Sequence, residues 1–322
     1  MLYLNSKDIT DIGINWIKTV EIIKKAVNVM NHSDFSQPIK PYLQFNDPDN
    51  RIIAMPAFAG GEFSVAGIKW IASFPKNLEV SIPRANSITI LNDATTGVPF
   101  ATINTPIVSG IRTASVSGLM IQEFDKVHNL NDVTLGIIGL GPIGQLHLQM
   151  ATTLLGDKIK NIRLFDISEI DKNKIPVELR EKVTICSSWE DVYRDADIFI
   201  TCTVSSKGYI DGPPKPNALL LNVSLRDFKT DILDYSPVIV VDNWEEVCRA
   251  NTDIEVMHNE RNLQKSDTLD IKDIVCSNAF KEITEDKVVM FHPMGMATFD
   301  IVIAQYYYDQ AIALGYGQPL EA

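Results

Sequence analysis

The chain has 322 residues, enough for two domains, and its 45% hydrophobic and 22% charged residues are typical of a globular protein. Its 29 Lys and Arg against 41 Asp and Glu give a formal net charge of −12, which argues against nucleic-acid or anionic-membrane partners because both require basic patches. We find no signal peptide or membrane-spanning stretch and expect a cytoplasmic location. The scattered cysteines indicate free thiols rather than a metal site or disulfides.

The first third of the chain predicts a helix followed by an antiparallel sheet. Apolar residues recur at helical spacing over residues 15–30. Short turns, among them Gly60-Gly61 and the segment DATTGVP, separate β-rich runs at 51–56, 65–74, 87–93 and 100–104. Helical spacing returns after Thr105 and leads into a second domain.

Three cations in this region have apolar neighbours in the sequence. Arg51 begins an apolar strand, Lys69 lies within the run GIKWI, and Arg112 interrupts the start of a helix of small residues. Each is compatible with a side chain that buries its stem and keeps its charge in water. A lysine among apolar residues is nevertheless costly unless it is paired or binds an anion. Three such positions favour a carboxylate-binding site.

From residue 134 onward strands and helices alternate, and the first turn carries a dinucleotide-binding fingerprint. A strand over 134–138 leads into GLGPIG, and a helix follows from about Pro142 to Leu155. The first two glycines permit a tight turn that exposes backbone N–H groups to a pyrophosphate, and the third permits close helix packing. Asp166 ends the next strand, where it can bind both ribose hydroxyls and repel a 2′-phosphate. The pattern therefore predicts an NAD site that includes Gly139, Gly141, Pro142, Ile143, Gly144 and Asp166.

Polar residues follow two of the later strands. Further strands are predicted at 183–186, 197–204, 218–225, 237–243 and 288–293, with room for only a short helix between Asp166 and Val183. An open parallel sheet presents ligand groups at the carboxyl ends of its strands. Thr203 and Ser205 are therefore cofactor candidates, and Asp227 is a candidate acid or base. An Asp after a strand is more often only a turn or helix-capping residue.

Several segments together resemble the ornithine cyclodeaminase/mu-crystallin family over nearly the whole chain. They are RIIAMP, GIKW, IRTASVS, GLGPIG with Asp166, and PMGMATFD. The resemblance implies an α/β fold in which a Rossmann NAD-binding domain, residues 113–293, is inserted into an α+β substrate-binding and dimerisation domain. Residues 1–112 form that second domain, and 294–322 complete it. The resemblance also implies a homodimer with a small amino-acid substrate.

The resemblance assigns roles to individual residues. It implies that Arg51, Lys69 and Arg112 bind substrate carboxylates. Arg84 and Lys40 are further candidates, because a substrate with three carboxylates would need more cations than alanine or ornithine does.

For the cofactor it implies a phosphate contact at Thr113 and contacts from Met294 and Gly295. It maps Asp227 onto the catalytic carboxylate. Lys69 is a second catalytic candidate if burial lowers its pKa.

Within the family, QPIKPYL, GIKWI and the Arg84-Ala85 pair resemble the branch that forms 2,3-diaminopropionate. This branch implies NAD-dependent oxidative hydrolysis of N-(2-amino-2-carboxyethyl)-L-glutamate to L-2,3-diaminopropionate and 2-oxoglutarate, with the product used for a siderophore or a peptide. The segment SLRDFKTD around Asp227 lacks the Pro-Gly turn of cyclodeaminases. Ornithine cyclodeaminase activity, alanine-type dehydrogenase activity and a mu-crystallin-like nucleotide-bound binding protein stay open as alternatives.

Overall fold

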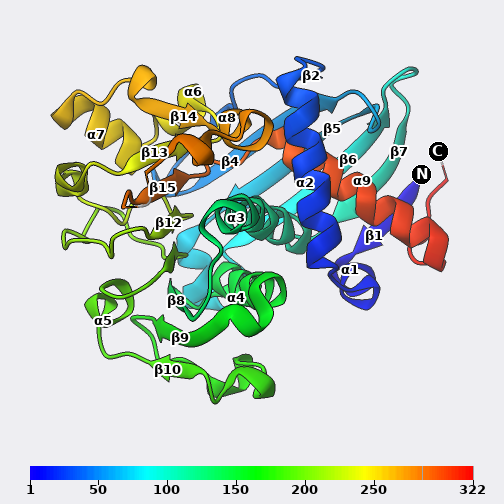
Figure 1. Cartoon of the computed structure of the whole chain (residues 1–322). Helices are drawn as coiled ribbons and strands as arrows, with labels where there is room; N and C mark the ends of the chain where they lie inside the picture. Colours follow the sequence, from blue (N-terminus) through cyan, green and yellow to red (C-terminus); the bar gives the residue numbers. More distant parts are fainter. Residues whose placement is uncertain (285, 322) are drawn as a thin grey trace. The chain divides into compact units, whose positions relative to one another are not determined.

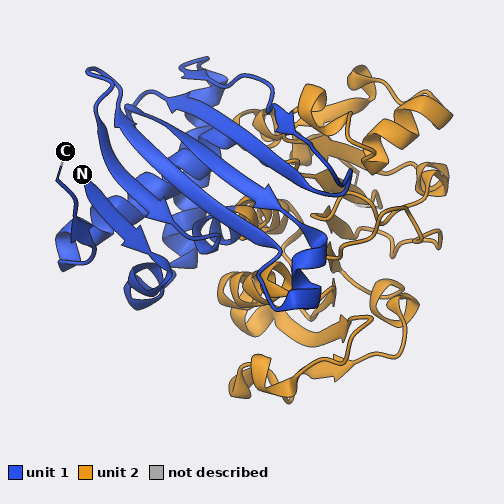
Figure 2. Ribbon diagram, turned by 180° about the vertical axis from the view of Figure 1, so that it is seen from behind, with its two compact units in different colours: residues 1–112, 295–322 blue, residues 113–294 orange. Residues whose placement is uncertain are grey.

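A computed structural model of the chain describes residues 1–284 and 286–321 (Figure 1). Residues 1–112 and 295–322 form unit 1, and residues 113–294 form unit 2 (Figure 2). The second boundary places Met294 in unit 2 and Gly295 in unit 1. No helix within the described ranges is long and apolar enough to cross a membrane.

A largely antiparallel sheet is the centre of unit 1. Its strands are β1 (Leu2–Asn5), β2 (Phe35–Ser36), β3 (Tyr42–Leu43), β4 (Arg51–Ala59), β5 (Val65–Ser73), β6 (Ala85–Asp93), β7 (Pro99–Asn104) and β16 (Gln318–Pro319). The order is β16-β1-β7-β6-β5-β4-β2, and β3 also pairs with β4. The antiparallel pairing predicted for the four long strands is confirmed, whereas the unforeseen β1 lies parallel to β7.

Helices cover one face of this sheet. They are α1 (Ser6–Ile12), α2 (Trp16–Asn31) and α9 (Ala297–Leu314), and a 3-10 helix, Pro75–Val80, follows β5. Helix α9 packs against β4, β5 and β6, and α2 packs against α9 (Figure 1). Because side chains alternate along a strand, Met55, Ala57 and Ala59 point into this buried layer together with Lys69 of β5. The opposite face has no helix of unit 1 over it among the described residues (Figure 2).

Unit 2 is built on a parallel sheet. Its strands are β8 (Val133–Ile138), β9 (Ile159–Phe165), β10 (Val183–Ile185), β11 (Ile198–Thr201), β12 (Leu219–Asn222), β13 (Val238–Val241), β14 (Thr268–Asp270) and β15 (Val289–His292). Its α-helices are α4 (Pro142–Leu155), α5 (Trp189–Tyr193), α6 (Trp244–Val247), α7 (Asp253–Arg261) and α8 (Ile271–Ser277), with 3-10 helices at Gly156–Lys158, Lys172–Lys174, Val177–Leu179, Thr230–Tyr235, Lys265–Asp267 and Ala279–Glu282. Helix α3 (Ile107–His128) contains the boundary after Arg112.

The strand order of unit 2 confirms the predicted Rossmann-type fold. The order β10-β9-β8-β11-β12-β15-β13-β14 reverses direction after β8, and the pairs between these strands are parallel. In folds with such a reversal, ligands bind outside the carboxyl ends of the two strands that flank it, here β8 and β11. The predicted strands are confirmed as elements, and β14 is an addition. The link from β9 to β10 contains only single-turn helices.

Candidate functional site

The turn after β8 has the geometry that the glycine pattern predicts. Gly139 has a φ of +83°, and its N–H donates to the Phe165 carbonyl at 2.9 Å. A Cβ on Gly144 would lie 2.0 Å from the Gly139 carbonyl oxygen, so only glycine permits this close approach. A Cβ on Gly141 would meet no atom of the residues that the structure describes within 4 Å. The turn is thus tight on its protein side and open above Gly141, where a pyrophosphate would need space.

Helix α4 begins at this open turn. Gly141 is its N-cap and Pro142 its first residue, and no side chain in the described ranges caps it. Uncapped backbone N–H groups, among them those of Ile143 and Gly144, together with the helix dipole favour an anion. Asp166 accepts the Leu140 N–H at 2.7 Å and the Ser168 N–H at 2.9 Å, which fixes its carboxylate beside the turn. These residues fit a dinucleotide with an unphosphorylated ribose.

Asp227 lies buried among hydroxyl groups on the loop that follows β12. Its carboxylate accepts hydrogen bonds from Thr203 and Ser224. Burial, followed by the interaction with Asp227, raises the pKa of Tyr209 above its usual value. The Asp227 carbonyl also accepts the N–H groups of Tyr209 and Ile210, each at 2.8 Å. A buried carboxylate surrounded by hydroxyl donors is equipped to hold and return a proton.

The remaining predicted cofactor residues of unit 2, which are Thr113, Thr203, Ser205 and Met294, lie on several separate segments. Thr203 joins the Asp227 cluster, and its Oγ1 accepts the Ser205 N–H at 3.2 Å. Ser205 directs its own hydroxyl to the Lys207 carbonyl. Met294 donates its N–H to Asp242 at 3.0 Å after the end of β15, and Thr113 is a residue of α3.

In unit 1, Lys69 and Arg112 share one buried acid, Asp300 of α9. Lys69 Nζ lies 2.9 Å from Asp300 Oδ2 and donates to Ser109 Oγ at 3.0 Å, while Arg112 Nε lies 2.8 Å from Asp300 Oδ1. Burial, together with the charges of Arg112 and Lys40, lowers the pKa of Lys69 to about 7 against the opposing effect of Asp300. Burial alone would raise the pKa of Asp300, but the charges of Arg112 and Lys69 hold it below its usual value. This cluster therefore contains a lysine that can exchange its proton near neutral pH.

Lys40 adds a third cation to the buried cluster. Its ammonium donates to the Gly295 carbonyl at 2.8 Å, and only 3% of the residue is exposed. A Cβ on Gly295 would lie 2.3 Å from an Arg112 guanidinium nitrogen, so the glycine makes room for that side chain. Lys40, Lys69 and Arg112 are all buried, and Lys69 and Arg112 share Asp300. Ammonium and guanidinium groups form strong charge-assisted hydrogen bonds with carboxylates, so the cluster suits an anionic substrate.

Arg51 and Arg84 lie farther along the sheet from the cluster. Arg51 pairs in register with Ser73, and the Arg84 Nε donates to Ser73 Oγ at 3.4 Å. Ser73 is four residues from Lys69 on the same face of β5, which corresponds to about 13 Å along the strand. The Arg51 guanidinium lies 5.5 Å from the centre of the Tyr42 ring, and its Nε is buried without a hydrogen-bond partner among the described residues. The sheet therefore carries a second cationic position, at a distance that a long polyanion can span.

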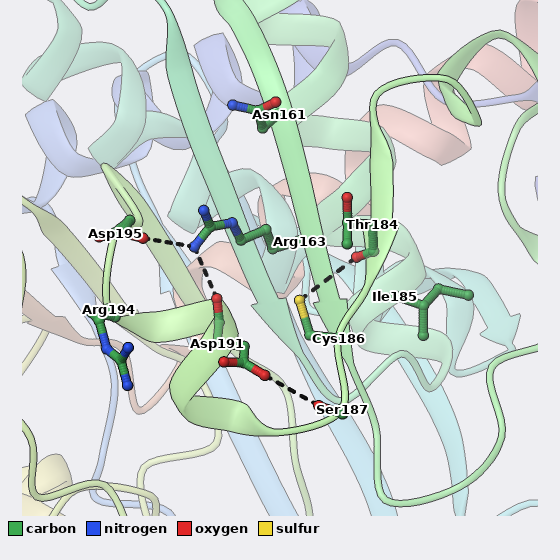
Figure 3. Close-up of a pocket in the computed structure, with 9 residues that line it drawn as sticks. All are labelled: Asn161, Arg163, Thr184, Ile185, Cys186, Ser187, Asp191, Arg194 and Asp195. Atoms are coloured by element: carbon green, nitrogen blue, oxygen red, sulfur yellow. Dashed lines mark hydrogen bonds and ion pairs between the residues drawn. The ribbon is translucent and has the colours of Figure 1, made fainter.

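Unit 2 also has a pocket beside β9, β10 and α5 (Figure 3). Arg163 crosses it to donate to Asp195 and to the Asp191 carbonyl, at 3.0 and 2.9 Å. Its two arginines, Arg163 and Arg194, are balanced by those two aspartates. It contains none of the predicted site residues, and its charge balance does not favour an anionic cofactor.

Sequence reasoning missed the acids and amides that organise both clusters. Asp300 lies in the recognised segment PMGMATFD but carried no prediction, although an acid within the apolar start of α9 was a usable signal. Asp253 and Asn222 lie beneath the Asp227 loop and follow no motif. His292 is buried at the end of β15 and bonds to Asn222 at 3.1 Å. Across the described residues, no group of three or more His, Cys, Asp or Glu side chains could hold a metal ion.

The parallel sheet, the open glycine turn and Asp166 define a protein with a Rossmann-type nucleotide-binding unit, joined in the chain to an α+β unit with buried cations. The sequence profile of the ornithine cyclodeaminase/mu-crystallin family matches residues 6–314. An N-((2S)-2-amino-2-carboxyethyl)-L-glutamate dehydrogenase of Staphylococcus aureus is 32% identical over 325 residues, covering 97% of this chain and 95% of its own. The chain therefore belongs to the ornithine cyclodeaminase/mu-crystallin family.

Solved structures share the fold along the whole chain. A Delta(1)-pyrroline-2-carboxylate reductase of Thermococcus litoralis, in complex with NADH and L-proline, has a TM-score of 0.89 at 19% identity, covering 99% of this chain and 100% of its own. An archaeal alanine dehydrogenase dimer with bound NAD has a TM-score of 0.86 at 20% identity, covering 100% of this chain and 99% of its own. At these identities the likeness concerns the fold.

Proposed function

We propose that this protein is an NAD-dependent oxidoreductase that acts on the CH–NH group of an amino-acid conjugate. The specific reaction is the oxidative hydrolysis of N-(2-amino-2-carboxyethyl)-L-glutamate to L-2,3-diaminopropionate and 2-oxoglutarate. The observation that carries the proposal is the 32% identity, over 97% of the chain, with the Staphylococcus aureus dehydrogenase named for this substrate. The buried cations of unit 1 are the chemical support, because the substrate carries three carboxylates.

In this proposal the cofactor is NAD, bound at the glycine turn. The open space above Gly141, the uncapped start of α4 and the fixed carboxylate of Asp166 support it. Bound NAD would supply the acceptor for the hydride that leaves the carbon next to the substrate nitrogen. Asp166 would hold the ribose hydroxyls, and its negative charge disfavours a 2′-phosphate. NAD is therefore preferred to NADP.

The proposal gives the cations of unit 1 two tasks. Lys40 and Arg112 bind substrate carboxylates and thereby fix the position of the reacting carbon, which contributes proximity. Lys69, with a pKa of about 7, can accept the proton of the substrate ammonium and leave a neutral amine, which oxidation requires. Arg51 and Arg84 bind a distal carboxylate, a position that alanine and ornithine would leave empty.

Asp227 of unit 2 is the proton shuttle of the hydrolytic step. Oxidation of the C–N bond gives an electrophilic carbon, to which water adds before the C–N bond breaks. Water must lose a proton as it adds, and the departing amine must gain one. A positioned acid–base group typically contributes about 100-fold to 10,000-fold to such transfers. The hydroxyls of Thr203 and Ser224 hold the Asp227 carboxylate for this role.

The test is to incubate the protein with NAD and the conjugate, and to quantify NADH, 2-oxoglutarate and 2,3-diaminopropionate. We expect the three products in equal amounts, and an Asp227→Asn variant that folds but turns over far more slowly. An inert conjugate together with conversion of ornithine to proline and ammonia, without net NADH, would establish cyclodeaminase activity instead. Oxidation of alanine would establish an alanine-type dehydrogenase. Nucleotide binding without any turnover would establish a mu-crystallin-like binding protein.

We further propose that the protein is a homodimer in which a second copy covers the open sheet face of unit 1. On β4 and β5 this face presents Ile52, Phe58, Ile68 and Trp70, and Trp70 is 41% exposed. An exposed apolar sheet face of this kind is typical of an interface. Trp70→Glu should shift the sedimentation of the protein toward the monomer, whereas Ile17→Glu, at a residue of α2 that is 63% exposed, should not. A monomeric parent protein would refute the proposal.

A further inference from the structure

The hydrogen bonds around Asn222 fix the orientation of its amide and the position of the Thr201 hydroxyl proton. The Asn222 Oδ1 faces the Leu225 N–H at 3.1 Å, and a backbone N–H can only donate. Its Nδ2 faces the carboxylate of Asp253 at 2.7 Å and His292 Nδ1 at 3.1 Å. The amide orientation is therefore determined. The Thr201 Oγ1 lies 3.0 Å from Asn222 Oδ1, which can only accept. Thr201 therefore donates its single hydroxyl proton to that oxygen.

This assignment leaves one proton too few beside Asp227. The Ser224 hydroxyl touches both Thr201 Oγ1, at 2.9 Å, and Asp227 Oδ2. Because the Thr201 proton is already used, each of these two contacts needs its own proton. Ser224 carries only one. Both contacts are hydrogen bonds only when Asp227 itself carries a proton on Oδ2.

We infer that Ser224 and Thr201 form a two-position hydroxyl switch that keeps Asp227 hydrogen-bonded in both of its protonation states. When Asp227 is ionised, Ser224 donates to the carboxylate. When Asp227 is protonated, it donates to Ser224, and Ser224 turns its proton to Thr201. No heavy atom moves, so the rearrangement on proton transfer is small. The inference rests on the proposed function, in which Asp227 accepts and returns a proton during hydrolysis.

The heavy atoms of the switch are held by Asp253, at the start of α7. Its Oδ2 accepts the N–H groups of Asp227 and Phe228, at 3.1 and 3.0 Å, and its own N–H donates to the Leu225 carbonyl at 2.8 Å. These bonds clamp the turn on both sides, and Leu225 adopts a φ of +66°, which is unusual for a leucine. Asp253 is therefore a positioning residue for Asp227.

Other titratable groups face the switch and must be considered in any pH experiment. Tyr209 interacts directly with the Asp227 carboxylate, and Cys202 lies within its electrostatic reach. Burial raises the pKa of Asp253 to about 6, and the nearby Asp227 contributes to that rise. A wild-type pH profile alone therefore does not identify the switch. Variants that change only one hydroxyl are needed.

Three variants separate the switch from a merely structural role. Ser224→Ala removes both positions, and we expect kcat to fall about 10-fold to 100-fold, as for a lost hydrogen bond to a charged group. KM should change little, because Ser224 binds no substrate. Ser224→Thr retains the hydroxyl and should restore most of kcat. Thr201→Val keeps the shape but removes the acceptor to which Ser224 donates when Asp227 is protonated, so the acidic limb of the kcat profile should move to lower pH.

A spectroscopic readout makes the inference independent of the substrate. The carboxyl C=O band of protonated Asp227, identified by infrared difference spectra against Asp227→Asn, should move to higher frequency in Ser224→Ala. Ser117→Ala, which removes another buried hydroxyl of unit 2, should leave the band and kcat unchanged. An unaltered band in Ser224→Ala overturns the switch even if the conjugate is the substrate. A shifted band with an inert conjugate supports the switch and rejects the proposed substrate.

Discussion

Lys69 offers a quantitative test of the buried cation cluster, through the substitution Lys69→Met. Methionine retains the length of the side chain without its charge, and Arg112 remains as the partner of Asp300. In the folded parent the pKa of Lys69 is about 7, whereas an unfolded lysine has a value near 10.5. Between these two values the unfolded chain binds a proton that the folded chain lacks. The free energy of unfolding of the parent must therefore rise with pH in this window.

The free energy of unfolding of the parent should rise by about 1.4 kcal/mol per pH unit in this window. Between about pH 8 and about pH 9.5 it should therefore increase by roughly 2 kcal/mol relative to that of Lys69→Met. The difference between the two proteins isolates Lys69, because their other titrating groups are shared. Urea unfolding of both proteins across this range measures it. Below about pH 6 the free energies of unfolding of the two proteins should change with pH in parallel, since Lys69 is then protonated in both the folded and the unfolded state. A difference that stays flat from about pH 6 to about pH 9.5 would mean that Lys69 remains a charged partner of Asp300, and it would refute the lowered pKa of Lys69.

Three further predictions follow from the site and from buried histidines. Arg112→Ala should raise KM and lower turnover, by about 10-fold to 100-fold in kcat/KM, if it folds. Unchanged steady-state kinetics would show that Arg112 does not bind the substrate. In binding titrations NAD should bind more tightly than NADP, and equal affinity would remove the role of Asp166. Burial lowers the pKa of His147 to about 4 and that of His292 to about 3, so the free energy of unfolding should fall as pH drops from about 6.5 toward 4. His147→Asn should lessen this acid sensitivity in urea titrations, and an identical pH dependence would contradict it.

The sequence predicted what local patterns encode. The strand before Gly139, the glycine spacing and the helix from Pro142 to Leu155 depend on neighbouring residues, and the structure has them at these positions. By contrast, β1 and β14 are short strands whose pairing partners lie far along the chain or beyond a long connection. Their propensity is weak, and tertiary pairing rather than local pattern decides them.

The partners of the predicted site residues were beyond sequence reasoning for the same reason. Lys69 was conspicuous as a lysine in an apolar run, but its acid, Asp300, is 231 residues away. Asp227 was conspicuous at the end of a strand, but Asp253 reaches its turn from the start of another helix. A local sequence pattern can indicate a candidate site residue such as Lys69 or Asp227, whereas its partner depends on the tertiary fold. That partner can come from any segment that the topology brings near.

Two of the buried acids of this protein, Asp300 and Asp227, illustrate opposite ways to manage a proton. Asp300 faces two cations and is held ionised by them, so the exchangeable proton of that cluster resides on Lys69. Asp227 faces neutral hydroxyls, with which both of its protonation states can form hydrogen bonds. A reaction that first needs a base for an ammonium and later an acid–base group for water requires these two arrangements in turn. The proposed oxidative hydrolysis has this order, and it assigns the first proton to Lys69 and the later ones to Asp227.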